Sequence, residues 1–283
     1  MNTLQRRNVL SRVDGRVLMV SILFVCCALF STLLKADIKS VEGLEFTRVL
    51  LIGNNQVKII QGDVAMLKIR GDKNKLNPAP FLISGDTLQL GITKNGHEIS
   101  KIKYKLTVPM LEALEVRGSG EAFVKPLRVS DLVVVVEGSG DIRMYDVNAV
   151  DLEMRVSGSG MLQAVNVNAR EARLTLKGSG DIQLGSLQAE SLSSILQGSG
   201  DIGIQDKSQV QNLHISVMGS GDVSLKKLRA AVCNVSIMGS GDVKVQVQEE
   251  LDVEIMGSGD LHYWGNPRTS TSVLGSGDVQ KRD

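Results

Sequence analysis

After about residue 40, apolar and polar residues alternate along most of the chain, and short glycine-rich segments interrupt this alternation at regular intervals. A period of two is typical of β-strands, because successive side chains of a strand point to opposite faces. One alternating run precedes each glycine-rich segment, for example Leu132, Val134 and Val136, and another follows it, for example Ile142 and Met144. The pattern therefore predicts at least two short strands in each repeating unit.

The glycine-rich segments are Gly-Ser-Gly triplets, which occur nine times at steps of 18 to 21 residues. They begin at Gly118, Gly138, Gly158, Gly178, Gly198, Gly219, Gly239, Gly257 and Gly275. Glycine adopts positive φ and lets backbones approach closely, so we expect each triplet to form a corner. A unit this short can bury its apolar side only by stacking on its neighbours. We therefore predict an all-β fold, a right-handed parallel β-helix, with the hand taken from the general preference of parallel crossovers.

The region from Val41 to Val116 lacks the triplet but still alternates, as at Val57 and Ile59, and turn residues punctuate it. An exposed end coil would be an open sheet edge that recruits other chains, so a cap is needed. We expect three parts: an N-terminal segment (1–36), a cap of irregular coils or a small sheet (37–116), and the repeat (117–283). The far end has less protection, which leaves end-to-end association open.

An uninterrupted apolar run at residues 17–34 follows four arginines and precedes Lys35 and Asp37. Its 18 residues are near the lower limit for crossing a bilayer and slightly longer than the usual core of a signal peptide. We predict an uncleaved membrane anchor, with the β part outside the cytoplasmic membrane in the periplasm. Cleavage before Asp37, which would release an exported protein, stays open, as does a twin-arginine route suggested by Arg6 and Arg7.

The charge balance and the cysteine content bear on nucleic-acid binding and on disulfide bonds. The 32 basic and 31 acidic residues leave no overall field that would attract nucleic acid, so no nucleic-acid partner is expected. Cys26 and Cys27 lie inside the apolar run, which leaves Cys233 alone in the β part and predicts no disulfide there. Cys233 stands where other repeats have leucine, for example Leu132 and Leu152, and is expected to be a core residue rather than a reactive thiol.

Leu114 to Gly120, which follow Val108-Pro109, and the subsequent Gly-Ser-Gly-Asp series resemble the head GIN domain family of bacteria, described as auto-transporter adhesins. The resemblance covers about residues 41–283. It implies a β-solenoid of the cell envelope with a role in adhesion, and it implies no catalytic residues.

Aspartate follows seven of the nine triplets, while Glu121 and Met161 stand in the other two places. Six consecutive coils align the aspartates Asp181, Asp201, Asp222, Asp242, Asp260 and Asp278. Carboxylates at the coil spacing of about 4.8 Å repel one another, so some interaction must offset the repulsion. The interpretation we favour is that serine or glycine amides of the same or the neighbouring turn donate to the carboxylates. The alternative is a calcium ladder, in which oxygen atoms of adjacent turns surround each ion.

The repeat has no nucleophile with a base, no metal cluster and no phosphate-binding loop, and it points to no cofactor. We therefore expect a non-enzymatic module for binding, adhesion or scaffolding. The alternative is a carbohydrate-active enzyme of the lyase or hydrolase type, which an acidic pair beside an aromatic-lined groove would support. The aromatic residues of the repeat are few: Phe123, Tyr145, Tyr263 and Trp264.

The residue before the triplet changes from polar to apolar along the repeat. Polar residues come first, at Glu137, Ser157, Lys177 and Gln197, and apolar residues follow, at Met218, Met238, Met256 and Leu274. If the strand alternation continues to the triplet, the second group forms an outward apolar stripe that would contact another protein or a second copy. The alternative is that the corner turns these side chains inward.

Overall fold

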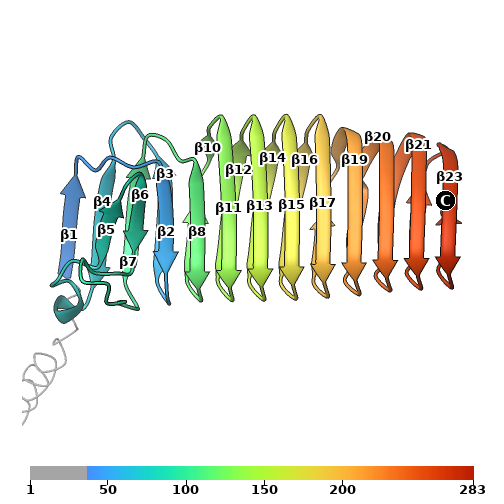
Figure 1. The fold of residues 1–283 in the computed structure, drawn as a ribbon. Coiled ribbons are helices and arrows are strands. Elements are labelled where there is room, and N and C mark those ends of the chain that lie inside the picture. The colour runs from blue at the N-terminus through green and yellow to red at the C-terminus, as the bar shows by residue number, and fades with distance from the viewer. Residues whose placement is uncertain (1–36) are drawn as a thin grey trace, which may run out of the picture. The chain divides into compact units, whose positions relative to one another are not determined.

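The computed structural model describes residues 37–283, which form one compact unit (Figure 1). The predicted anchor at residues 17–34, with Cys26 and Cys27, lies outside the described residues. All 24 strands belong to one continuous sheet, and the only helix among the described residues is the short 3-10 turn η1 (Lys73–Lys75). No helix within residues 37–283 has the length and apolar character needed to span a membrane.

The strands that lead into the triplets stack in parallel as one wall, here called the front wall, which faces the viewer in Figure 1. Each residue pairs with the residue at the same position of the next coil, so that Gly138, Gly158 and Gly178 lie in one column. The front wall contains β2 (Arg48–Ile52), β8 (Ala113–Gly118), β11 (Asp131–Gly138), β13 (Asp151–Gly158), β15 (Glu171–Gly178), β17 (Ser191–Gly198), the later parts of β19 (Ser208–Gly219), β20 (Val223–Gly239) and β21 (Val243–Gly257), and β23 (Arg268–Gly275).

The strands that follow the triplets form the back wall, which is also parallel. It contains β3 (Gln56–Gln61), β9 (Glu121–Val124), β12 (Asp141–Asn148), β14 (Met161–Asn168), β16 (Asp181–Gln188), β18 (Asp201–Ile204), the first halves of β20 and β21, β22 (Leu261–Trp264) and β24 (Val279–Lys281). In Figure 1 the chain runs down the front wall, returns up the back wall and advances to the right, which is a right-handed winding. The predicted right-handed parallel β-helix is therefore confirmed.

A short side wall, which the sequence analysis missed, joins the back wall to the next front strand. The pairing of β12 with β14 skips Tyr145 and resumes at Asp146, where the strand bends. Beyond this bend, β10 (Leu127–Arg128) pairs with the end of β12. Its sequence signal is a shift of one residue in the alternation, since Met144 and Val147 are buried while Tyr145 is exposed.

The core follows from the alternation, because each apolar residue that points inward stacks on its equivalent one coil away. Val136, Val156, Leu176 and Leu196 form one such column and are fully buried. Each contributes roughly 1.5–3 kcal/mol relative to an exposed position. Ser194 interrupts another column of this core, and its buried hydroxyl has no hydrogen-bond partner.

The N-terminal end is closed by a chain crossover and antiparallel strands. The coil made of β2 and β3 lies between β8 and β9 on one side and a coil made of β6 (Thr87–Leu90) and β7 (Lys103–Val108) on the other. Beyond these, β4 (Met66–Gly71) pairs antiparallel with β7, β1 (Asp37–Glu42) with β4, and β5 (Phe81–Ser84) with β6. The predicted boundary at residue 117 falls inside β8, so cap and repeat share one stack.

The last coil has polar residues where earlier coils have apolar ones. Thr269 and Thr271 pair with the buried Leu251 and Val253, and all eight residues of β23 are exposed. Among the described residues, β23 pairs only with β21. Two of the three inward positions of β23 are therefore polar, and the third is Val273, while among the described residues one edge of its backbone stays unpaired.

Candidate functional site

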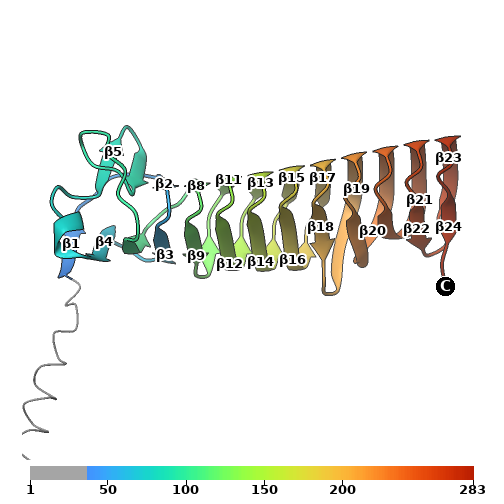
Figure 2. The ribbon, with the colours of Figure 1, turned by 90° about the horizontal axis from the view of Figure 1, so that it is seen from below.

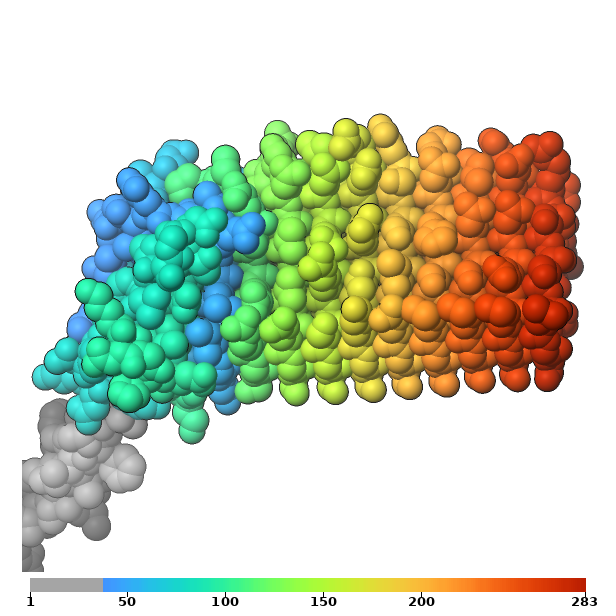
Figure 3. Space-filling model, viewed as in Figure 1, coloured from blue at the N-terminus to red at the C-terminus, as the bar shows by residue number. Residues whose placement is uncertain are grey.

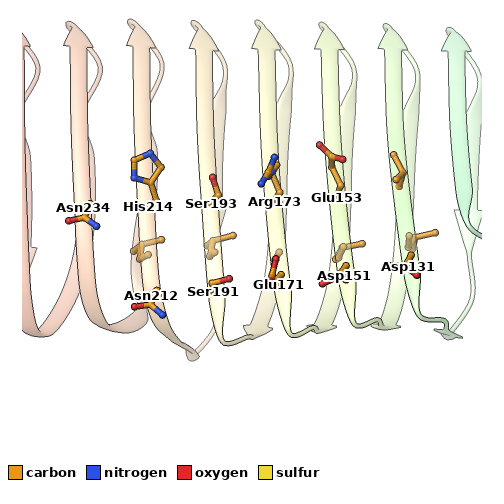
Figure 4. A pocket seen from close by; sticks show the side chains of 16 residues that line it. Asp131, Asp151, Glu153, Glu171, Arg173, Ser191, Ser193, Asn212, His214 and Asn234 are labelled. Carbon is orange, nitrogen blue, oxygen red and sulfur yellow. The ribbon is translucent and has the colours of Figure 1, made fainter.

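A shallow groove of about 370 Å³ crosses the front wall from β11 to β20. Figure 4 shows two rows of side chains that border it, each row taking one residue from each successive strand. The rows are Asp131, Asp151, Glu171, Ser191 and Asn212, and then Glu153, Arg173, Ser193, His214 and Asn234. Between them lie residues with buried side chains, such as Leu152 and Leu192, so the strand backbone forms the floor. The space-filling view of the front wall shows such rows crossing the coils (Figure 3).

The chemistry of the groove changes along the stack. Its first coils are acidic, and two of the carboxylates are already paired: Asp151 Oδ1 lies 3.0 Å from Arg170 Nη2, and Glu153 Oε1 lies 2.7 Å from Arg155 Nη2. The later coils are neutral, with hydroxyl, amide and imidazole groups that both donate and accept hydrogen bonds. The groove was not predicted from the sequence, because its signal is the polar character of outward positions two residues apart over several coils.

The groove has no aromatic residue in its lining, which weakens the predicted enzyme alternative. None of the four aromatic residues named from the sequence lines this groove, and three of them lie close to cations. Tyr145 has Lys125 Nζ 4.0 Å from its ring centroid, and Trp264 has Lys226 Nζ at 4.2 Å. The acidic residues of this groove therefore have no aromatic side chain beside them in its lining.

The aspartate column forms a hydrogen-bonded ladder at the corner between front and back walls. Oδ1 of Asp181 accepts the backbone N–H of Asp201 at 3.0 Å, and Asp222 accepts that of Asp242 at 2.9 Å. The same bond links Asp201 to Asp222, Asp242 to Asp260, and Asp260 to Asp278. The donor is the amide of the next aspartate rather than a serine or glycine amide. The last carboxylate, Asp278, has its pKa lowered by hydrogen bonds from Gln280 and the Val279 amide.

Within the described part of the chain, no three His, Cys, Asp or Glu side chains converge in a way that could hold a metal ion. The aspartates use one carboxylate oxygen each for the ladder, which offsets part of their mutual repulsion. The geometry therefore gives the column a structural role in aligning successive coils.

The predicted apolar stripe lies on the outside of the molecule. Met238, Met256 and Leu274 are 38%, 40% and 67% exposed, and Met218 is partly exposed. They pair in register from coil to coil, so they form one continuous row along the stack. The alternative that the corner turns these side chains inward is wrong, because the strand alternation continues up to the first glycine.

Cys233 is fully buried in the core, as its position in the repeat predicts. Burial raises the pKa of its thiol to about 12. The thiolate is the reactive form of cysteine, so Cys233 is not expected to act as a nucleophile at neutral pH.

Among solved structures, a crystal structure described as a "putative lipid binding protein" from Parabacteroides distasonis is 26% identical, with a TM-score of 0.62. Two others, described as putative adhesins from Parabacteroides distasonis and Parabacteroides merdae, are 19% and 18% identical, each with a TM-score of 0.64. In all three cases the match covers 88% of this chain and 97% of the other chain. The two adhesins, at this level of identity, show the shared fold alone. No curated protein matches the chain.

A family model described as "Putative auto-transporter adhesin, head GIN domain" matches residues 45–210 and 164–267. These two matches together span the closed N-terminal end and most of the repeat. The chain therefore belongs to the head GIN domain family.

Proposed function

We propose that this protein is a non-enzymatic binding module of the cell envelope, which holds an extended polymer in the groove of the front wall. The observation that carries the proposal is the groove itself, to which β13, β15, β17 and β19 each contribute two polar residues. Because the strands pair residue for residue, these side chains sit at fixed spacings on a rigid frame.

The composition of the groove favours a glycan strand as the ligand. Ser191, Ser193 and Asn212 can donate to and accept from the hydroxyl and amide groups of sugars. Hydrogen bonds of this kind specify orientation while each adds only about 0.5–1.5 kcal/mol, so affinity requires several coils. The family's description as adhesins agrees with a binding role.

The test is cosedimentation of the full chain with purified peptidoglycan sacculi. Ser193→Trp places an indole in the groove and should weaken binding about tenfold, the equivalent of about 1.4 kcal/mol. Thr175→Trp is the matched control, since Thr175 points outward from the same wall but does not line the groove. Equal binding of sacculi by the two variants would contradict the groove as the binding site.

Two further measurements separate the alternatives. Vesicles with and without anionic lipid address the lipid ligand suggested by the description of one similar crystal structure. Release of new reducing ends from the sacculi would instead support the carbohydrate-active enzyme. The binding proposal expects sedimentation with sacculi and no release of reducing ends.

Localisation is part of the proposal. The apolar run at residues 17–34 would hold the chain in the cytoplasmic membrane, with the β-solenoid in the periplasm, and cleavage before Asp37 would release it. Fractionation of cells followed by N-terminal sequencing distinguishes the two, because a mature chain beginning at Asp37 would exclude the anchor.

A second role, self-association, rests on the exposure of the apolar stripe. A straight row of side chains repeated at the coil spacing can pair with the same row of a second copy across a two-fold axis. Replacing Met238 and Met256 together by serine should convert a dimer to a monomer in light scattering after size exclusion. An unchanged mass for this double variant would contradict the stripe as an interface.

A further inference from the structure

The side wall changes its outline where the coils become shorter. Successive triplets are 21 residues apart from Gly198 to Gly219 and 20 from Gly219 to Gly239, but 18 in the two following steps. The missing residues come from the side wall, because Leu225 pairs with Val245 while Arg229 pairs with the very next residue, Gln246. Figure 2 shows the wall reaching farthest out beside β19 and β20 and receding toward β22 and β24.

A pocket of about 620 Å³ occupies this step. The long coils supply one side with Lys207, Lys226, Lys227 and Arg229, and the short coils supply the other with Gln246 and Trp264. The pocket therefore exists because a long coil overhangs a shorter one.

The cationic side of the pocket is held in place by the fold. Ser208, which is buried, accepts a hydrogen bond from the Leu187 amide at 2.8 Å and donates to the Asp206 carbonyl at 2.9 Å. The Asp206 amide in turn donates to the Gly185 carbonyl at 2.8 Å. These bonds fix the turn that carries Lys207.

Trp264 is fixed in a similar way. Its indole Nε1–H donates to the backbone oxygen of Asp283 at 3.1 Å, and Lys226 Nζ lies 4.2 Å from the ring centroid. A cation over an aromatic face is itself favourable, because the ring presents the negative part of its quadrupole to the charge. The ring and the ammonium group are thus placed together before any ligand binds.

The charge of the pocket is not neutralised by the protein. Four cations face one acidic residue of the lining, Asp283, and none of the four forms an ion pair with another described residue. By contrast, Arg143, Arg155 and Arg170 on other parts of the stack are all paired with carboxylates. Four positive charges that face a single acidic residue favour an anionic ligand.

We propose that this step in the side wall is a binding site for an anionic sugar, one that carries carboxylate or phosphate groups. The cations bind the anionic group, and the amides of Gln188, Gln209 and Gln246, which lie in one register column, bind hydroxyl groups. A lipid surface is the less fitting ligand, since none of the large exposed apolar side chains lines this pocket. The site lies on a different wall from the groove and does not depend on it.

Isothermal titration calorimetry of the full chain tests the proposal, with oligogalacturonate, a neutral oligogalactoside of equal length and glucose 6-phosphate as probes. At least one anionic sugar should bind and the neutral one should not. Lys226→Gln should weaken that binding about tenfold, as expected for loss of a charge-assisted hydrogen bond. Trp264→Ala should also weaken it, since the ring positions Lys226.

Lys177→Gln is the matched control, because it removes the same charge from an exposed position outside the pocket and the groove. An equal loss in Lys177→Gln and Lys226→Gln, or no binding of either anionic sugar, would overturn the proposal. Binding to anionic vesicles alone would assign the pocket to lipid headgroups instead. Ser193→Trp, which blocks the groove, should leave the binding of the anionic sugar unchanged, so the proposal for the groove and the proposal for the pocket are tested separately.

Discussion

The corner at Gly53 and the corners of the repeat occupy equivalent register positions but close the coil with different groups. Gly53, Asn54 and Asn55 stand opposite Gly118, Ser119 and Gly120. In the repeat, both glycines are packed against the backbone of the preceding coil. At the first corner, a buried asparagine replaces the second glycine and bonds to three backbone groups.

This difference between the corners shows what the stacking of coils requires of the residues at a corner. A Cβ atom at Gly140 would lie 2.6 Å from the carbonyl oxygen of Gly120, so the interior corners have no room for a side chain at this glycine position. Asn55 faces Gly120 on one side, but on its other side it meets residues 91–102 rather than another glycine corner. Its side-chain amide bonds to the Ile52 and Ile99 carbonyls and to the Ile102 N–H. The repeat is therefore held by close backbone packing and its end by a polar side chain.

The largest effect is expected from breaking an interior corner with Gly138→Ala. Gly138 has φ of +113°, and an added Cβ would lie 2.7 Å from the Gly118 carbonyl oxygen. Strain and overpacking together should lower the free energy of unfolding by about 3–5 kcal/mol. Urea unfolding measures the change, with Ser139→Ala at the exposed middle of the same triplet as the control. Similar midpoints for the two variants would contradict the close packing of the corner.

Asn55→Ala should lower the free energy of unfolding by a smaller amount and should destabilise only the N-terminal end. The change leaves three backbone groups without their partner and should cost about 2–4 kcal/mol. Hydrogen exchange should increase in the strands near the cap. Labelling of the buried Cys233 thiol in residues 37–283 should stay slow, because the repeat holds itself. Asn54→Ala, at an exposed position of the same corner, is the control. Faster labelling of Cys233 would show that the two regions unfold together.

The aspartate ladder should contribute a smaller amount at each coil. Asp222→Ala removes the acceptor for the Asp242 amide and should cost about 1 kcal/mol, whereas Asp222→Asn keeps an oxygen acceptor and should change stability little. Thermal unfolding in EDTA and in calcium checks the alternative interpretation. A rise in Tm with calcium that Asp222→Ala abolishes would show that the column binds the ion.

The smallest expected change is an increase in the free energy of unfolding rather than a decrease. Ser194 interrupts an apolar column between Leu174 and Ile215, and its buried hydroxyl has no partner. Ser194→Ala removes the cost of burying that hydroxyl and should raise the free energy of unfolding by about 0.5–1 kcal/mol. Ser193→Ala, on the outward face of the same strand, is the matched control for urea unfolding. A loss of stability in Ser194→Ala would indicate that the hydroxyl has a partner in solution.

The candidate sites could be predicted only in part. The stripe of Met238 and Met256 was visible because its exposure follows from the local strand alternation. The groove and the pocket were not visible, because they are assembled from strands whose equivalent positions are about 20 residues apart, and these strands acquire a shared chemistry only when coils stack. The shortening of the last coils was present in the triplet spacing, but the pairing of β20 with β21 decides which wall loses the residues.

The sequence by itself determined the strands, the glycine corners and the parallel stack of coils, because each depends on a local period that the chain repeats many times. Only the tertiary structure decided how the N-terminal end closes. The coil of β2 and β3 inserts between segments that follow it in sequence, and Asn55 bonds to Ile102, 47 residues away. No local pattern specifies such a pairing, since it results from the competition among sheet edges to bury their apolar faces and satisfy their backbone groups.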